Sequence, residues 1–287
     1  MEKQELIKEL KLLAIEQRRR LIELSESYSG NIHLGGDMSM SDVLVALYHY
    51  GMNVSPENIT SPDRDRFILS KGHAAVSMYI AMSLEGFIDF EEIKRTYGQL
   101  DSAYGMHPCK VRLPYLECSS GSLGQGLSMA AGMALWGRQK KIGYRVFCML
   151  GDGETCEGSV WEAAMYAGSA KLKNLVAIVD RNHQMMTSYT DVPGANMNLE
   201  PYGDKWKAFG WNTIIVEDGN DMEQLVEAID ALKAYQGDKP TALICHTIKG
   251  KGISFMERAI SWHSGSVGAE QAKIAYQELA AEKEMLQ

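Results

Sequence analysis

The sequence has no apolar run long enough to cross a lipid bilayer, and it has no secretory signal at its start. Residues 1–24 form a charged amphipathic helical pattern, without the basic, apolar and small-residue blocks of a leader peptide. The net charge is −8 and no stripe of Lys and Arg is present, which removes the usual electrostatic basis of nucleic-acid binding. We therefore expect a soluble protein with no nucleic-acid partner and no membrane partner.

Cysteine is scarce, and the five cysteines form no CxxC pair. Two of them, Cys148 and Cys245, lie in apolar runs that resemble buried strands. An odd number of such cysteines indicates small packing residues in a reducing cytoplasm, and argues against a disulfide framework or a thiolate metal site. The predicted location is cytoplasmic.

Strand-like and helical patterns alternate along the 287 residues, and no repeat, low-complexity tract or Gly/Ser linker divides them. The strand-like runs are apolar on both faces, as expected of strands buried in a parallel sheet. They are residues 66–70, 146–150, 175–180, 213–216 and 241–245. This order predicts an α/β fold, a doubly wound, mainly parallel sheet with helices on both faces, as one domain over residues 1–287.

Helical patterns stand between these runs, and two of them begin at residues that can cap a helix. A serine can cap the helix at 41–50, and Asp221 can cap the helix that follows it. The predicted helices are 41–50, 124–139, 158–170, 221–235 and a final one from Ala269. The stretches 188–202 and 261–268 lack periodicity and are predicted as long loops, which are often functional.

The richest glycine loop, Gly151-Asp152-Gly153-Glu154, directly follows the second predicted strand. Asn182 comes 30 positions after Asp152 and follows the third strand. Both therefore lie at carboxyl ends of parallel strands, where open α/β sheets bind ligands. Carboxylate and amide oxygens suit Mg²⁺, which shares its coordination with phosphate oxygens. Asp-Gly alone is common turn chemistry, but its pairing with Asn182 favours a metal and phosphate site.

This pairing resembles the thiamine diphosphate signature, in which GDG is followed by Asn after about thirty residues. The surrounding loops resemble those of transketolases, and the similarity extends over roughly residues 15–265. The stretches that carry it are GDGETCEGSVWEA (151–163), DRFILSKGHA (65–74), SSGSLGQGLS (119–128), SGNIHLGGDMS (29–39) and TIKGKGISFME (247–257). The sequence is similar to the N-terminal subunit of two-chain transketolases.

The resemblance implies a bound thiamine diphosphate and a Mg²⁺ ion, which Ca²⁺ or Mn²⁺ can replace. It assigns the metal to Asp152, Asn182 and the backbone carbonyl of Gln184. The implied cofactor-binding residues are His73, Gly121, Leu123, Gly153, Glu154, Asn182 and His263. Glu157 and Glu162 match acidic residues at a subunit interface of the family.

Four histidines in glycine-rich loops match catalytic positions of the family, namely His33, His73, His107 and His263. Imidazoles can move protons to and from sugar hydroxyls at physiological pH. The other three histidines, His49, His183 and His246, are interpreted as surface or core residues. Lys249-Gly-Lys-Gly lacks the spacing of a Walker loop and is interpreted as a flexible turn.

In the family, a second, pyrimidine-binding domain supplies the glutamate that activates the cofactor and the residues that hold the sugar phosphate. The resemblance therefore implies a C-terminal partner subunit that carries this domain, an α₂β₂ assembly, and no turnover by this chain alone. The implied reaction is transfer of a two-carbon ketol unit from a ketose phosphate, or a related anionic ketose, to an aldose.

Three loops depart from the family's usual pattern. Asn31-Ile32 precedes His33, Met106 precedes His107 where glycine is usual, and Ser-Gly-Ser-Val without a proline follows His263. All three would face the substrate, whereas the metal and diphosphate loops match well. Either the sugar specificity is altered, towards an unusual anionic or branched ketose, or these loops have simply drifted.

Two other functions remain open. The α subunit of a 2-oxo acid dehydrogenase shares GDG and Asn, but the Ser-Lys-Gly-His73 and Gly-Ser-Leu-Gly-Gln-Gly126 loops argue against it. A catalytically silent, regulatory transketolase-like protein should lose its metal and diphosphate ligands first. Here Asp152, Asn182, His73 and His263 are all present.

Overall fold

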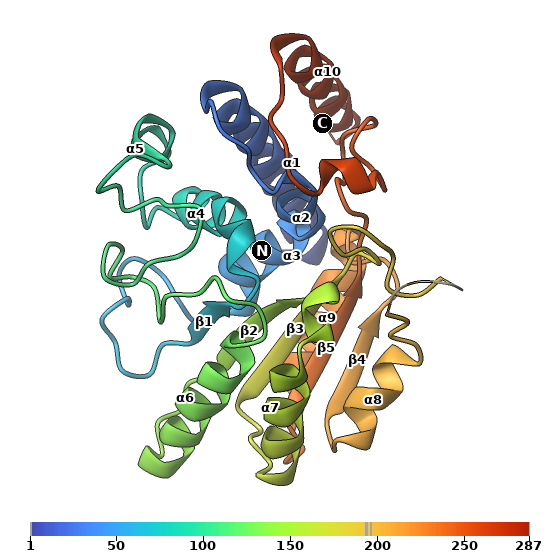
Figure 1. Cartoon of the computed structure of the whole chain (residues 1–287). Coiled ribbons are helices and arrows are strands. Elements are labelled where there is room, and N and C mark those ends of the chain that lie inside the picture. The colour runs from blue at the N-terminus through green and yellow to red at the C-terminus, as the bar shows by residue number, and fades with distance from the viewer. Residues whose placement is uncertain (1, 193–194, 196, 287) are drawn as a thin grey trace.

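The computed structural model describes residues 2–192, 195 and 197–286 of the chain. Its centre is a sheet of five parallel strands in the order β1-β2-β3-β5-β4 (Figure 1). The strands are β1 (Arg66–Leu69), β2 (Val146–Gly151), β3 (Leu175–Arg181), β4 (Asn212–Val216) and β5 (Thr241–His246). Each lies within one residue, at either end, of a predicted strand, so the parallel sheet is confirmed.

Helices cover both faces of this sheet (Figure 1). The α-helices are α1 (Lys3–Ser27), α2 (Leu34–Ser39), α3 (Ser41–Ala46), α4 (Ala75–Leu84), α5 (Phe90–Thr96), α6 (Gly126–Lys140), α7 (Gly158–Ser169), α8 (Tyr202–Ala208), α9 (Met222–Ala234) and α10 (Ala269–Met285). Short helical turns of other types are η1 (Leu47–Gly51), η2 (Gly72–Ala74), η3 (Gly153–Cys156) and η4 (Ile260–His263). The doubly wound α/β architecture predicted from the sequence is confirmed.

The strands separate two hydrophobic cores because successive side chains point to opposite faces of the sheet. Phe147 and Met149 of β2 pack into the core formed with α1, α3, α4 and α9. Cys148 and Leu150 pack into the core formed with α6, α7 and α8. All four side chains are fully buried, which explains why this run is apolar on both faces.

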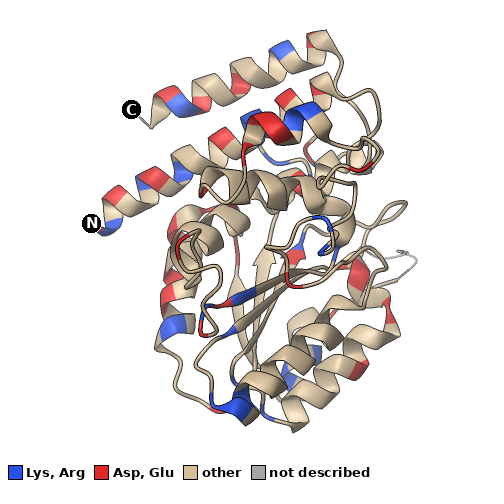
Figure 2. Ribbon diagram, turned by 90° about the vertical axis from the view of Figure 1, so that its left-hand side faces the viewer, with Lys and Arg blue, Asp and Glu red and all other residues tan. Residues whose placement is uncertain are grey.

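The N-terminal helix α1 and the C-terminal helix α10 pack against each other and run antiparallel, with acidic and basic side chains along both (Figure 2). Among the described residues, no helix is both long enough and apolar enough to span a membrane. All five cysteines are free, with Cys148 and Cys245 buried, as expected.

The predicted helix caps have different outcomes. Asp221 caps α9 as predicted, since its side chain accepts hydrogen bonds from the N–H groups of Glu223 and Gln224. The serine cap predicted for the helix at 41–50 is wrong. Ser39 ends α2 and Ser41 is already helical, with its hydroxyl donating to the carbonyl of Asp37. The α-helical part, α3, ends at Ala46, and the chain continues as the π-helical turn η1.

The long loop predicted at 188–202 contains no helix before α8 in its described part, and residues 193, 194 and 196 lie outside the described residues. The predicted loop at 261–268 includes most of η4. The sequence did not indicate α2, α4, α5 or α8.

Candidate active site

The carboxyl ends of β1, β2, β3 and β5 meet at one edge of the sheet, and the loops after them enclose a cavity of about 500 Å³. Lys71, Met185 and Lys249 are among its lining residues. All the predicted site residues except His107 line it too, namely His33, His73, Gly121, Leu123, Asp152, Gly153, Glu154, Asn182, Gln184 and His263. The fold thus brings together residues that lie up to 230 positions apart in the sequence.

Asp152 follows β2, and its carboxylate is buried. Its Oδ1 accepts from Gly153 N at 2.8 Å, and its Oδ2 accepts from His183 N and Thr190 Oγ1, both at 2.9 Å. Burial raises the pKa of Asp152, and the Arg181 guanidinium, with Nη1 3.7 Å from Oδ2, opposes that rise. A divalent cation beside this carboxylate would also favour the ionised form.

Asn182 is the first residue after β3, and its Oδ1 accepts from Gln184 N at 3.2 Å. The Gln184 carbonyl lies over Gly153, since a Cβ on that glycine would be 3.7 Å from its oxygen. A carboxylate, an amide and a carbonyl oxygen, a donor set that suits Mg²⁺, therefore line one part of the cavity. Among the described residues, no three His, Cys, Asp or Glu side chains form a metal cluster, so ligand oxygens would complete the coordination.

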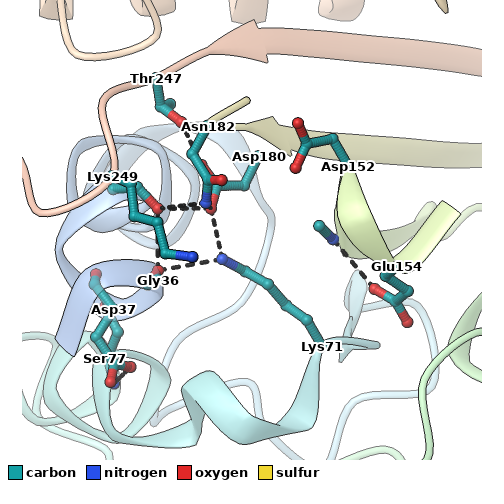
Figure 3. A network of polar contacts seen from close by, with 12 residues as sticks. Gly36, Asp37, Lys71, Ser77, Asp152, Glu154, Asp180, Asn182, Thr247 and Lys249 are labelled. Atoms are coloured by element: carbon teal, nitrogen blue, oxygen red, sulfur yellow. Dashed lines mark hydrogen bonds and ion pairs between the residues drawn. The ribbon is translucent and has the colours of Figure 1, made fainter. Parts of the chain in front are cut away.

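Two buried lysines also line the cavity (Figure 3). Nζ of Lys71 lies 2.5 Å from Asp180 Oδ2 and donates to the carbonyl of Gly36 at 3.1 Å. Lys249 is 2% exposed, and no carboxylate of the described residues lies within 4.0 Å of its Nζ, which instead lies 2.8 Å from Nδ1 of His263. Burial lowers the pKa of Lys249 to about 8, so it is still protonated at pH 7. A buried ammonium without a counter-ion favours an anionic ligand.

Three of the predicted histidines form a cluster. Their ring centroids lie 5.0 Å apart for His33–His73, 5.5 Å for His33–His263 and 5.7 Å for His73–His263. Burial, followed by the charge of Lys71, lowers the pKa of His73 to about 2. Burial and Lys249 lower that of His263 to about 4, and burial also lowers the pKa of His33. At pH 7 the three rings are therefore neutral, each with one donor and one acceptor nitrogen.

His33 and His107 differ in how they reach the cavity. Nδ1 of His33 is buried and has no hydrogen-bond partner among the described residues, so a polar ligand group can satisfy it. His107 does not line the cavity, but its ring packs against Gly121, where an added Cβ would be 3.2 Å from His107 Cδ2. The lack of a side chain at Gly121 allows this close approach.

Glu154 lines the cavity and hydrogen-bonds to two loops and to the end of β2. Its Oε1 accepts from Gly124 N at 2.9 Å and from the hydroxyl of Ser70, and its Oε2 accepts from Gly151 N, at the end of β2, at 3.1 Å. Ser70 Oγ in turn accepts from Gly126 N at 3.0 Å, at the start of α6. The Glu154 carboxylate therefore fixes these three segments relative to one another.

The protein-family model described as transketolase, thiamine diphosphate binding domain, matches residues 3–286. The chain belongs to the transketolase family. The transketolase of Campylobacter jejuni has the same fold, with a TM-score of 0.83 and 25% identity over 97% of this chain and 46% of that one. The chain spans just under half the length of the solved transketolases that it matches.

Two transketolase subunits are similar to it over most of their lengths. The chain is 38% identical over 281 residues to an apulose-4-phosphate transketolase subunit of Phocaeicola vulgatus, an alignment that covers 98% of this chain and 97% of that protein. It is 38% identical over 250 residues to the 6-deoxy-6-sulfo-D-fructose transketolase subunit SqwG of Clostridium sp. (strain MSTE9), over 87% and 89% of the two chains. The predicted similarity to N-terminal subunits of split transketolases, and with it the enzyme class, is confirmed.

Two of the loops that depart from the usual transketolase pattern are neighbours in space. Ile32 and Gly265 exchange two backbone hydrogen bonds of 2.9 Å, so the segments before His33 and after His263 form one rim. Met106, the third departure, is 38% exposed. The departures therefore lie at residues flanking the predicted histidines, and the Asp152 loop is unaffected.

Sequence reasoning missed both cavity lysines of this transketolase domain, Lys71 and Lys249. Lys249 lies in a turn, as predicted, but its side chain is buried and lines the cavity, which the interpretation as a flexible turn did not foresee. A signal was available, since Lys249 comes three residues after the carboxyl end of β5, next to β3. The rings of His49, His183 and His246, interpreted from the sequence as surface or core residues, do not line the cavity.

Proposed function

We propose that this chain is the thiamine diphosphate- and Mg²⁺-binding N-terminal subunit of a two-subunit transketolase. The assembly would transfer a two-carbon ketol unit from a ketose phosphate, or a related anionic ketose, to an aldose acceptor. The observation that carries the proposal is Lys249, a buried ammonium without a carboxylate partner among the described residues, in the same cavity as Asp152 and Asn182. One negatively charged diphosphate with its cation satisfies all three groups.

The cofactor, when bound, supplies the nucleophilic carbon that attacks the ketose carbonyl. Asp152, Asn182 and the Gln184 carbonyl would hold Mg²⁺, which Ca²⁺ or Mn²⁺ can replace. The wall residues would contact the diphosphate and rings of the cofactor, namely His73, Gly121, Leu123, Gly153, Glu154, Asn182 and His263. The whole chain would form a single diphosphate-binding domain in the cytoplasm.

The histidines would exchange protons or hydrogen bonds with the hydroxyl groups of the sugar substrate. His33 and His73 are neutral in this cavity, so each can accept a proton from a sugar hydroxyl and return it. His263 accepts a hydrogen bond from Lys249 at Nδ1, so its Nε2–H would donate to a substrate oxygen. His107 packs against Gly121, behind the cavity wall. It would act through the wall residues, or contact the sugar once the sugar is bound.

A partner chain would complete the site. Two relatives that this chain matches over most of their lengths carry the word subunit in their names. We propose a C-terminal subunit with a pyrimidine-binding domain, in an α₂β₂ assembly. Glu157 and Glu162, which lie at the start of α7 and within it, are the proposed acidic contacts of that interface.

The substrate would be a modified ketose. The relatives' names specify apulose 4-phosphate and 6-deoxy-6-sulfo-D-fructose. The shared rim of Ile32 and Gly265 supports a specificity that differs from the usual transketolase sugars, because it joins the segments that carry the cavity residues His33 and His263. Ketol transfer from xylulose 5-phosphate that exceeds transfer from every branched or sulfonated ketose would contradict this part.

The test is calorimetric titration of the chain with thiamine diphosphate and MgCl₂, then a ketol-transfer assay with the co-purified partner. We expect binding that requires Mg²⁺, and turnover only when both chains are present. Lys249→Met should weaken thiamine diphosphate binding about 10- to 100-fold, the range for a lost charged hydrogen bond. Lys251→Met, two residues along the same turn, should bind like the wild type. No binding even with the partner would instead indicate a catalytically silent protein.

A further inference from the structure

Asp180 lies at the centre of a buried network beside the cavity (Figure 3). It is the second-last residue of β3 and is fully buried. Its Oδ2 accepts from Ser39 Oγ at 2.6 Å and from Asn182 Nδ2 at 3.1 Å, and lies 2.5 Å from Lys71 Nζ. Its Oδ1 accepts from the hydroxyl of Thr247. Its oxygens are thus engaged by the protein, so it is not free to bind a cation.

The contact with Asn182 decides which way that amide faces. A carboxylate only accepts hydrogen bonds, so the side of the amide towards Asp180 must be its NH₂ group. Nδ2 donates to Asp180 Oδ2 and, at 3.3 Å, to Ser39 Oγ. Oδ1 is thereby turned away, to where it accepts from Gln184 N at 3.2 Å. Rotation of the amide by half a turn would set Oδ1 against the carboxylate.

We propose that Asp180 is a positioning residue for the divalent cation. It holds the Asn182 amide with its oxygen towards the metal position, and its charge is balanced by Lys71. Groups that orient metal ligands in this way typically change metal affinity about 10- to 100-fold when removed. This inference rests on the proposed function, because it concerns the Mg²⁺ that would accompany thiamine diphosphate.

The test measures how thiamine diphosphate binding to the full chain depends on MgCl₂ concentration, by calorimetry at fixed cofactor. Asp180→Asn replaces one acceptor oxygen by an NH₂ group and leaves the size unchanged. We expect the MgCl₂ concentration for half-saturation to rise about 10- to 100-fold, with binding restored at high MgCl₂. A merely structural role would weaken binding at every MgCl₂ concentration, without such rescue.

Two further variants keep the test decisive. Ser39→Ala removes one acceptor of Asn182 Nδ2 and leaves the Lys71–Asp180 ion pair intact, so it decides the matter if Asp180→Asn does not fold. In Ser39→Ala, the MgCl₂ concentration for half-saturation should rise several-fold. Asp37→Asn is the matched control, since Asp37 is equally buried and accepts from Ser77 N at 3.0 Å, but does not contact Asn182. It should keep the wild-type Mg²⁺ dependence.

The outcomes separate the two proposals. If the wild type shows no Mg²⁺-dependent binding of thiamine diphosphate, the proposed function fails. If the wild type binds, and folded Asp180→Asn and Ser39→Ala both keep its Mg²⁺ dependence, only the positioning role of Asp180 is overturned. An equal change in Asp37→Asn would also overturn it, because the effect would then follow from any lost buried acid.

Discussion

Nζ of Lys249 lies 2.8 Å from Nδ1 of His263, so a buried ammonium donates its hydrogen bond to an imidazole. An ammonium cannot accept, and Nδ1 must therefore be the unprotonated nitrogen, with the ring's proton on Nε2. The positive charge also opposes a second proton on the ring. Lys249 thus sets both the tautomer and the charge of His263.

Lys249→Met should raise the pKa of His263. Burial and Lys249 are the two largest causes of its low value of about 4, and only the second is removed. We expect a pKa above 4 but still below the ordinary 6.5, because burial remains. NMR titration of the His263 ring in the full chain measures this, with Lys251→Met as the control. An unchanged His263 pKa in Lys249→Met would contradict the coupling.

The buried imidazole of His73 should make the chain less stable in acid. Its folded pKa of about 2 lies below the unfolded value of about 6.5, so between these values only the unfolded chain binds the proton. The contribution of the neutral His73 ring to stability is therefore complete above pH 6.5 and is lost as the pH falls. Between pH 7 and pH 5 the wild type should lose about 2 kcal/mol more of its free energy of unfolding than His73→Gln does.

His49 serves as a control because its effect on stability should change with pH in the opposite direction. Its hydrogen bond to Glu85 raises its pKa, so its contribution is complete below the unfolded pKa and is lost as the pH rises through the folded value. Urea unfolding across the same pH range measures the difference in free energy of unfolding between each variant and the wild type. This difference should change with pH in opposite directions for His49→Gln and His73→Gln. Parallel slopes would contradict the assignment.

Loss of one partner from the Arg18–Asp42 ion pair should be strongly destabilising. The side chains are 2% and 7% exposed, so Asp42→Ala leaves an uncompensated guanidinium in the core beneath α1. We expect the free energy of unfolding to fall by about 3–5 kcal/mol, and by less in the double variant Arg18→Met/Asp42→Leu. Asp238→Ala breaks the exposed pair with Lys171 and should leave the free energy of unfolding almost unchanged in the same denaturation experiment.

Two helical glycines should respond in opposite ways to alanine. A Cβ on Gly168 of α7 would lie 1.8 Å from the carbonyl oxygen of Phe209, which forces backbone to move. Gly168→Ala should therefore lower the free energy of unfolding by at least about 1–3 kcal/mol. Gly132 of α6 has no described atom within 4 Å of such a Cβ, and Gly132→Ala should raise it by about 0.5–1 kcal/mol. Urea denaturation of both variants measures these two changes in the free energy of unfolding.

The strands could be predicted because burial on both faces leaves a local signature, as at Val146–Gly151 in β2. The positions of Asp152 and Asn182 could be predicted because each directly follows such a strand, whereas the other predicted cavity residues came from the resemblance to transketolases. Contacts between distant segments leave no comparable signal. Lys71 and Asp180 pair across 109 positions, so neither identifies the other in the sequence.

The errors have similar physical causes. A serine before a helical pattern predicts a cap, but the chain around Ser41 is already helical, so its hydroxyl bonds back to Asp37. Lys249 stands among glycines in a turn, and only the position of β5 beside β3 brings it into the cavity.

The hydrogen bonds of Glu154 join the end of β2 at Gly151 to the loops that carry Ser70 and Gly124, so the protein itself fixes these segments to one another. Little conformational freedom then remains to be lost there on binding, which favours affinity for the cofactor. The rim at Ile32 and Gly265 is held by its own two hydrogen bonds and shares none of these contacts. Under the proposed function, sugar preference would therefore diverge by substitutions at the rim, with the cofactor wall left unaltered.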